Sequence, residues 1–413
     1  MKKIIILLLI TIFVFTISTK QISAENLIDA GELKIKIGSS ENGFSLQTSE
    51  GFQLLDGYTV IETVYDNNIK IYYNNGIFIE SGSSNYGPYM DIKVKANDNK
   101  VIYNNHEYNG LFTLAENGRS LVNIIDMETY IYSVVANEVG DSFEVEAIKA
   151  QALAARSYAL YNSKKFIDKG YNLSSDAISQ VYRGNKGVSQ KIKNAVDETR
   201  GEVIVYNDEI IDATYGSTSG GATAAAEDTW GKAFPYLIAK SDPYSLNSPR
   251  VNWTYKTNTG LIDQNLSKGT NMSNFTSIVF NKNELGRIVS VGVEYAGGKV
   301  SLRAERFRSL MGVSNLKSTK FEINSPSLMD GTNQNESLYK SCLLQGYGRA
   351  SDSFTLYNNG GNDEVEFVGM GVGHGVGMSQ YGANEMAKQN FNYRDIVRFY
   401  YEGAEVKKIY DWY

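Results

Sequence analysis

Short runs of alternating or continuous apolar residues dominate the first part of the chain. Turns rich in Asn and Gly separate them, such as the one at Asn74-Asn75-Gly76. The runs with this character are Leu33–Ile37, Thr59–Val64, Ile69–Tyr73 and Met90–Val94. Because β-branched and aromatic residues favour strands, residues 25–107 are predicted to form a β-rich accessory domain.

The pattern changes between residues 129 and 161. The β-branched and aromatic run Ile131–Val135 predicts a strand that ends at Asn137–Gly140. Asp141 and Glu144 then have the spacing of a capping box, which satisfies free N–H groups at the start of a helix. From position 145 to 160 the residues are apolar and small on almost every face, so we expect a helix buried in the middle of a domain.

The remaining pattern mixes strands with amphipathic helices. Strands are predicted at Leu111–Leu114, Ser120–Ile125, Glu202–Tyr206, Ile210–Tyr215, Thr276–Phe280 and Ile288–Glu294. Helices are predicted at Ile192–Thr199, Arg303–Met311, Ser379–Lys388 and Tyr393–Tyr401, and residues 324–337 read as a loop. The expected fold class is therefore α+β: mixed strands pack on a buried helix, with an N-terminal β-rich module and strand-rich insertions. The second domain is expected to span residues 108–413.

The first 24 residues have the character of an export signal. Lys2 and Lys3 precede the apolar run Ile4–Ile17, and cleavage after Ala24 is plausible from its small side chain. The run is short for a membrane span, which needs about 20 residues. The alternative that the segment is an uncleaved membrane anchor stays open. We expect the protein to be exported, either into the cell wall or anchored to the membrane and facing the wall.

Composition narrows the possible partners. The single cysteine, Cys342, allows no internal disulfide, which fits a Gram-positive wall or an intermembrane space better than an animal secretory route. A net charge of −6 argues against nucleic acid as a partner. The 29 tyrosines are numerous, and an amphipathic ring is a common floor beneath a sugar.

Few residues could carry chemistry. Two histidines and one cysteine do not easily make a catalytic zinc site, and the chain has no GxSxG motif for a serine hydrolase. Glu138, between the predicted strand and helix, is either a functional carboxylate or a surface glutamate in a turn. Burial would raise its pKa, whereas Lys149 or Arg156, which share one helix face, would lower it. We expect the raised value.

A glycine-rich block, residues 369–377, has glycine at every second position. Its spacing matches neither GxGxxG nor GxxxxGK[ST], so a nucleotide loop is not indicated. Alternating glycines predict a strand with one bare face that another chain or a ligand can approach. His374 in this block is either a buried structural residue or a catalytic one, and the hydroxyl-rich turn at Ser217–Gly221 could be no more than a turn.

Four blocks of the sequence resemble one family. They are SVVANEVGDSFEVEAIKAQALAARSYAL at 133–160, TYGSTSGG at 214–221 with EDTWG at 227–231, SLRAERFRSLMGVSNLKSTKFEI at 301–323, and GMGVGHGVGMSQYGANEMAKQNFNYRDIVRFYYEG at 369–403. In this order they resemble the stage II sporulation protein D family, which also includes amidase enhancers. The resemblance covers most of residues 108–403.

The resemblance implies a lytic transglycosylase that acts on peptidoglycan glycan strands from which an N-acetylmuramoyl-L-alanine amidase has removed the stem peptides. Glu138 matches the family's catalytic glutamate, although the usual Glu-Met-Pro is Glu-Val-Gly here. The implied substrate contacts, which we expect to line one groove with Glu138, are Gln180, Tyr182, Tyr215, Ser217, Thr218, Ser219, His374, Gln380 and Tyr381. The rival possibility is a non-catalytic glycan-binding protein that stimulates an amidase. If the organism sporulates, the resemblance implies a location in the intermembrane space of the forespore.

The sequence also departs from the family in ways that bear on cofactors. Some members carry cysteine and histidine in the region equivalent to residues 172–184 and bind zinc there, but this chain has neither residue in that region. We therefore expect no metal and no other cofactor. Many members have histidine where this chain has Gly216, so any role of that imidazole is absent here.

Overall fold

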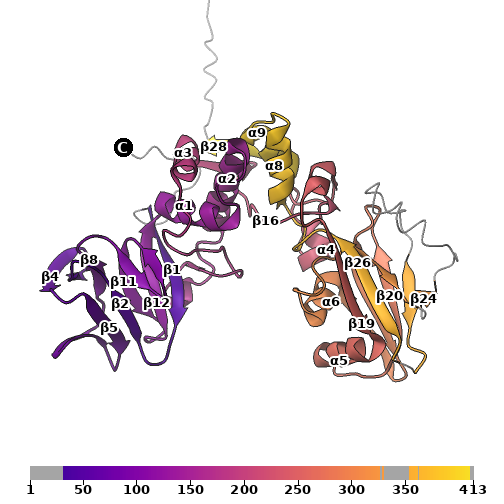
Figure 1. The fold of residues 1–413 in the computed structure, drawn as a ribbon, viewed down its shortest axis with the longest axis horizontal. Helices are drawn as coiled ribbons and strands as arrows, with labels where there is room; N and C mark the ends of the chain where they lie inside the picture. The colour runs from indigo at the N-terminus through magenta and orange to yellow at the C-terminus, as the bar shows by residue number, and fades with distance from the viewer. Residues whose placement is uncertain (1–30, 326–327, 330–352, 361, 410–413) are drawn as a thin grey trace, which may run out of the picture.

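The computed structural model describes residues 31–325, 328–329, 353–360 and 362–409. Two strand-rich lobes lie at opposite ends of the molecule, and a group of helices lies between them (Figure 1). Helices, strands and several sheets occur together in the described ranges, which confirms the α+β class. No helix in these ranges is long and apolar enough to cross a membrane, and the run Ile4–Ile17 lies outside them.

The N-terminal lobe contains two sheets. The order of the seven-stranded sheet is β13-β1-β12-β11-β8-β3-β4, with β1 (Glu32–Ser39), β3 (Phe52–Asp56), β4 (Thr59–Val64), β8 (Lys93–Ala96), β11 (Leu111–Ala115), β12 (Ser120–Asp126) and β13 (Leu173–Ser174). The order of the six-stranded sheet is β10-β9-β2-β5-β6-β7, with β2 (Phe44–Gln47), β5 (Asn68–Tyr73), β6 (Ile77–Ser81), β7 (Ser84–Tyr89), β9 (Val101–Tyr103) and β10 (His106–Tyr108). The alternation of the sequence has its expected result in β5, where Ile69 and Ile71 are buried and Asn68 and Lys70 are exposed.

Three of the four strands predicted in this lobe are confirmed as β1, β4 and β5, and the fourth begins later than predicted, at Lys93. The domain boundary predicted at residue 107 falls between β8 and β11, two strands of the seven-stranded sheet. Strands β11 and β12 pair with β8 and β1, respectively, so the seven-stranded sheet continues past that position. β12 then leads directly into the first helix.

The first helix, α1 (Met127–Glu138), replaces the strand predicted at Ile131–Val135, so that prediction was wrong. A β-branched run fits either element, and two local features favour the helix. Asp126 caps it by accepting a hydrogen bond from the backbone N–H of Thr129 at 3.0 Å. The buried hydrophobic residues also recur at helical spacing, at positions 127, 130, 131, 134 and 135. Burial on one stripe of a helix outweighs the weak strand preference of single residues.

The second helix, α2 (Val145–Tyr161), is buried along most of its length, which confirms the central helix. The predicted capping box was wrong. The helix is capped by Glu144 without a side-chain hydrogen bond, and the backbone N–H of Glu144 donates to Oδ1 of Asn384 at 2.8 Å. Phe143, just before it, is buried against Tyr381 with ring centroids 5.3 Å apart, so tertiary packing sets this helix start.

The helices around α2 come from distant parts of the chain. They are α3 (Gln190–Glu198), α8 (Gln380–Lys388) and α9 (Tyr393–Tyr400), and all three were predicted within two residues of these bounds. A small sheet, β15 (Glu209–Ile210), β14 (Glu202–Tyr206) and β28 (Glu405–Lys408), joins the helical part to the end of the described chain. The hairpin over Asn207 and Asp208 is confirmed, although its second strand is shorter than predicted. The short elements of this region are η3 (Ile167–Lys169), β16 (Tyr215–Gly216), β17 (Gly221–Ala222), α4 (Ala226–Trp230), β18 (Ser241–Asp242), η4 (Pro243–Asn247) and β27 (Met378–Ser379).

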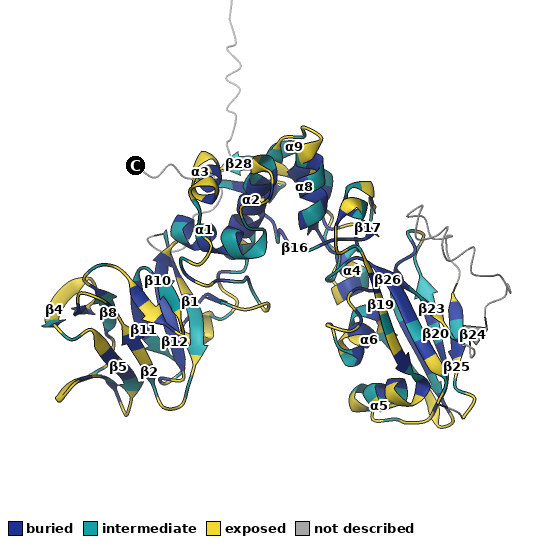
Figure 2. Ribbon diagram, viewed as in Figure 1, coloured by how far each residue is buried: buried dark blue, intermediate teal, exposed yellow. Residues whose placement is uncertain are grey.

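The other strand-rich lobe has a hydrophobic core of its own (Figure 2). Its elements are β19 (Asn252–Asn258), α5 (Thr259–Thr270), β20 (Phe275–Lys282), β21 (Ile288–Tyr295), β22 (Gly298–Arg303), α6 (Ala304–Met311), β23 (Phe321–Asn324), β24 (Leu328–Met329), β25 (Phe354–Tyr357) and β26 (Glu364–Met370). Strands β20 and β21 and helix α6 confirm the sequence predictions. Of the predicted loop 324–337, Leu328–Met329 form β24, and residues 330–337 lie outside the described residues, as does Cys342.

Candidate functional site

Glu138 lies where three chain segments meet. It is the last residue of α1, and its two carboxylate oxygens accept hydrogen bonds from different parts of the chain. The backbone N–H of Val181 donates to Oε1 at 3.2 Å, and Nε2 of Gln380 donates to Oε2 at 3.1 Å. Val181 belongs to the loop that follows β13, and Gln380 is the first residue of α8. The fold thus holds both oxygens of one half-buried carboxyl group.

The environment of Glu138 favours its protonated form. Burial raises the pKa of the carboxyl above its usual range, and the N–H donors from Val181 and Gln380 offset part of that rise. The two cations considered from the sequence are engaged elsewhere: Lys149 pairs with Glu146 at 2.9 Å, and Arg156 pairs with Glu128 at 2.7 Å. The predicted direction is therefore confirmed, and its cause is burial.

A second layer of hydrogen bonds surrounds Gln180, the residue before Val181. Its Nε2 donates to the hydroxyl of Tyr215 at 2.8 Å and to the carbonyl oxygen of Ala155 at 3.2 Å. Its Oε1 accepts a hydrogen bond from the hydroxyl of Tyr130 at 3.1 Å. Gln180 is 1% exposed, so the side chain lies inside this network. Three elements, α1, α2 and β16, are connected through one amide group.

A short parallel pairing brings the remaining motifs alongside. β16 pairs with β27, with Tyr215 opposite Met378 and Gly216 opposite Ser379. Just beyond the two strands, the backbone N–H of Tyr381 donates to the carbonyl oxygen of Ser217 at 3.1 Å. The segments around residues 215–217 and 378–381 therefore lie side by side next to Glu138, as the predicted site requires.

Comparison with known proteins shows which family the chain belongs to. A sequence model of the Stage II sporulation protein family matches residues 115–206, which contain α1, α2 and the loop of Val181. The chain is 32% identical over 299 residues to Stage II sporulation protein D of Bacillus subtilis, an alignment that covers 69% of this chain and 75% of that protein. The chain belongs to the Stage II sporulation protein family.

Two further relatives support this family membership. Stage II sporulation protein D of Bacillus amyloliquefaciens is 31% identical over 303 residues, with 69% of this chain and 75% of that protein covered. The Amidase enhancer of Bacillus subtilis is 29% identical over 300 residues, with 66% of this chain and 39% of that protein covered. The family resemblance drawn from the four sequence blocks is thus confirmed.

Three residues that the family resemblance marked as substrate contacts lie inside the fold, which is a correction. Tyr182 is 2% exposed, and its hydroxyl donates to Oδ1 of Asn123 at 2.6 Å. Thr218 and Ser219 are also 2% exposed, and their hydroxyls donate to the carbonyl oxygen of Ser245 and to Oδ2 of Asp242, respectively. Because each hydroxyl already has a buried partner, these residues stabilise the turn and the loop instead of facing a ligand.

The glycine-rich block of this family member is not a strand, so that prediction was wrong. β26 ends at Met370, and Gly371, Gly373, Gly375 and Gly377 all have positive φ, between 72° and 105°. In this left-handed region a side chain is disfavoured. At Gly375 an added Cβ would also lie 2.8 Å from Nη2 of Arg287. The alternate glycines therefore allow the backbone conformation of a loop, and they do not form a strand with one face free of side chains.

His374 lies in that loop and is uncharged at neutral pH. Burial, with Arg308 and Arg287 nearby, lowers its pKa to about 4. Its Nδ1 accepts a hydrogen bond from the backbone N–H of Val376 at 3.0 Å, and its ring lies 5.2 Å from that of Trp230. These contacts favour a structural role in the loop. Ser217 and Tyr381 are half-buried and stay predicted sugar contacts.

The loop that carries zinc ligands in some family members is held here by hydrogen bonds. The hydroxyl of Ser174 donates to Oδ1 of Asp176 at 2.9 Å and lies 3.2 Å from the hydroxyl of Ser179. Zinc is bound by thiolate, imidazole and carboxylate groups. Of the side chains of Ser174, Asp176 and Ser179, only that of Asp176 is such a group, so these three do not make a zinc ligand set. Throughout the described ranges, no three His, Cys, Asp or Glu residues are grouped as metal ligands.

Two groups at this site were not predicted from the sequence. Val181 acts through its backbone N–H, which no side-chain pattern can reveal. Tyr130 comes directly before the run Ile131–Val135 that was predicted as a strand, and the strand prediction does not indicate that Tyr130 points into the core. A surface hollow of about 390 Å³ lies elsewhere, against Lys36, Glu116 and Arg119. The single groove expected along the predicted site residues stays a prediction.

Proposed function

We propose that this protein is a peptidoglycan lytic transglycosylase in which Glu138 is the general acid and base. The observation that carries the proposal is the carboxyl of Glu138 itself: burial raises its pKa, and N–H groups of Val181 and Gln380 hold both of its oxygens. The raised pKa favours the protonated form that a general acid needs, and the two N–H donors stabilise the carboxylate left after the proton is given up. Family membership supports a role in the cell wall.

One carboxyl group suffices when the substrate supplies the nucleophile. Glu138 gives its proton to the glycosidic oxygen as the bond from C1 of N-acetylmuramic acid to that oxygen breaks. The C6 hydroxyl of the same sugar forms a bond to C1, and the carboxylate accepts the hydroxyl's proton. The products are a 1,6-anhydro end and a new free hydroxyl, with no water consumed. The paired carboxylates of ordinary glycosidases are not needed for this reaction.

The substrate class follows from the same reasoning. We propose that the glycan strands have lost their stem peptides to an N-acetylmuramoyl-L-alanine amidase, which would be the functional partner. The apolar run Ile4–Ile17 after Lys2 and Lys3 supports export to the cell wall or anchoring at the membrane. Sugar contacts are proposed for Ser217 and Tyr381, whose segments lie next to Glu138.

A second function is supported by one relative, the Amidase enhancer of Bacillus subtilis. In this alternative the protein binds glycan strands without cleaving them and increases the activity of an amidase. The two functions differ in one observable product, because only the transglycosylase forms 1,6-anhydro ends.

The deciding experiment is mass spectrometry of peptide-free glycan strands after incubation with the purified protein. The wild type should release 1,6-anhydro fragments, and Glu138→Gln should form them about 100-fold more slowly or worse. Glu144→Gln is a matched control, because Glu144 is exposed and its side chain makes no capping bond. Equal rates for Glu138→Gln and the wild type would remove Glu138 from the mechanism. No anhydro product from the wild type, with stimulation of an added amidase, would establish the enhancer function instead.

A further inference from the structure

We infer that Gln380 and Gln180 are positioning residues for Glu138 rather than sugar contacts: one holds Oε2 directly, and the other fixes the loop whose Val181 N–H holds Oε1. The inference rests on the proposed function of Glu138 and deepens it. The original expectation was that both glutamines contact the glycan.

Gln380 is held in place by the start of its helix. Ser379 caps α8 by accepting a hydrogen bond from the backbone N–H of Gly382 at 3.1 Å. Gln380 is the first residue of that helix and is 6% exposed, so its side chain has little freedom. Its Nε2 lies 3.1 Å from Oε2 of Glu138. This N–H donor is therefore directed at the carboxylate of Glu138 and not at a ligand.

Gln180 has used both of its N–H donors. They are directed at the hydroxyl of Tyr215 and at the carbonyl oxygen of Ala155, while the hydroxyl of Tyr130 donates to its oxygen. An amide side chain has two N–H donors, so none remains for a ligand. What the network does fix is the backbone that follows, because Val181 is the next residue and its N–H points at Glu138.

The loop is also held from its other side. The backbone N–H of Tyr182 donates to the carbonyl oxygen of Ser175 at 3.2 Å, and its hydroxyl donates to Asn123 at 2.6 Å. Val181 therefore lies between two anchored residues, one on each side. Its N–H needs no rearrangement to reach Oε1.

This arrangement matches what proton donation requires. As Glu138 gives up its proton, negative charge develops on the carboxyl group, and two N–H donors already point at it. Donors in place before the reaction stabilise such a charge without the cost of reorganisation. The titratable groups that face Glu138 are the hydroxyls of Tyr130 and Tyr215, whose pKa values burial raises well above the usual range, so both stay neutral.

The test measures the carboxyl group itself. In protein carrying ¹³C-labelled glutamate, the signal of Glu138, assigned from its loss in Glu138→Gln, is followed by NMR as pH is changed. Gln380→Met removes the N–H donor and should make Glu138 bind its proton roughly tenfold more tightly. Gln180→Met should change it in the same direction. Gln380→Asn, which keeps the amide but is shorter, should resemble Gln380→Met and serves if that variant does not fold.

The matched control is Gln389→Met. Gln389 is exposed at the end of the same helix and makes the same kind of bond, from its Nε2 to Oε1 of Glu385 at 3.1 Å. It should leave the titration of Glu138 unchanged. An unchanged titration of Glu138 in Gln380→Asn and Gln180→Met would overturn the inference. Because NMR needs no cleavage, that result is distinct from failure of the proposed function, which would show as absence of anhydro product in the wild type.

Discussion

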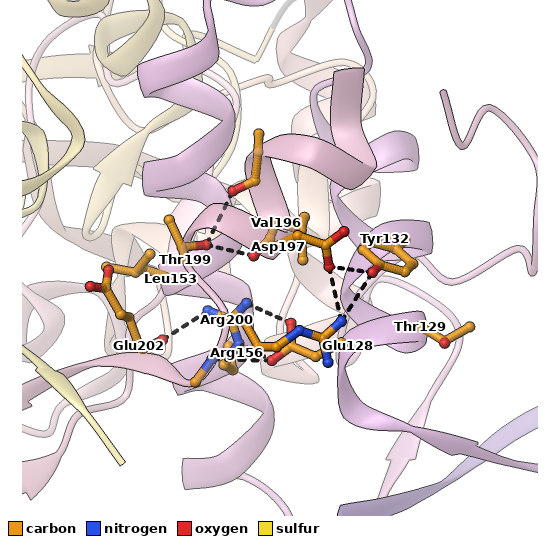
Figure 3. A network of polar contacts seen from close by, with 12 residues as sticks. Glu128, Thr129, Tyr132, Leu153, Arg156, Val196, Asp197, Thr199, Arg200 and Glu202 are labelled. Atoms are coloured by element: carbon orange, nitrogen blue, oxygen red, sulfur yellow. Dashed lines mark hydrogen bonds and ion pairs between the residues drawn. The ribbon is translucent and has the colours of Figure 1, made fainter. Parts of the chain in front are cut away.

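Replacing Arg156 by methionine should lower the free energy of unfolding by about 3 to 5 kcal/mol. Arg156 is fully buried in α2, and its guanidinium group donates to both oxygens of Glu128 at 3.0 and 2.7 Å (Figure 3). A third donor, Nη1, reaches the carbonyl oxygen of Glu202 at 2.8 Å. The side chain thus ties α1, the helix that carries Glu138, to α2 and β14.

The magnitude comes from what the substitution leaves behind. Methionine fills much of the same volume, so the packing loss is small. Glu128, whose side chain is 3% exposed, would remain in the interior without its bidentate partner. Removing one member of a buried ion pair costs several kcal/mol, whereas replacing both members by apolar residues is often close to neutral. The double variant Glu128→Met/Arg156→Met should therefore regain most of the lost stability.

Urea unfolding followed by circular dichroism at the helix band measures these differences. Arg200→Met is the matched control, because Arg200 pairs with Asp197 on the surface with side-chain exposures of 36% and 46%. An exposed pair of this kind should contribute no more than about 1 kcal/mol. If Arg156→Met loses no more stability than Arg200→Met, or if the double variant is less stable than Arg156→Met alone, the reasoning about this buried pair is refuted.

Three further predictions concern the site. Burial raises the pKa of Glu138 in the folded protein, so the stability linked to its proton is full below the unfolded-state pKa and lost as pH rises through the folded-state pKa. In urea unfolding, the stability of Glu138→Gln should match that of the wild type near about pH 4 and exceed it near about pH 8. Equal stabilities of the two proteins at both pH values would contradict the raised pKa. Gly375→Ala should lower the thermal midpoint, because its Cβ would lie 2.8 Å from Arg287 Nη2 at a φ of 79°, whereas Gly297→Ala, with open space around it, should not. Activity and the thermal midpoint should be unchanged in EDTA. A decrease in either one that zinc restores would show that the protein has metal ligands.

The local sequence pattern was sufficient to predict those elements whose structure depends mainly on neighbouring residues. The strands β5 and β14, and the helices α3, α8 and α9, follow from alternation, helical period and capping, and they were predicted. These signals act over neighbouring residues, so they are complete in the sequence. α1 shows where they conflict: its residues suit a strand, and the cap at Asp126 with burial of one stripe against the core decides for the helix.

The sequence by itself also determined the family, since the motifs are contiguous, and through the family it indicated Glu138 as the candidate catalytic residue. Only the tertiary structure decided what surrounds that residue. Gln380 lies 242 positions from Glu138 and Tyr215 lies 35 from Gln180, and such distances carry no local signal. Tyr182 and Ser219, polar residues in motifs, were expected on the surface but are buried with partners. Burial and hydrogen-bond partners depend on which segments pack together, and that is a property of the whole fold.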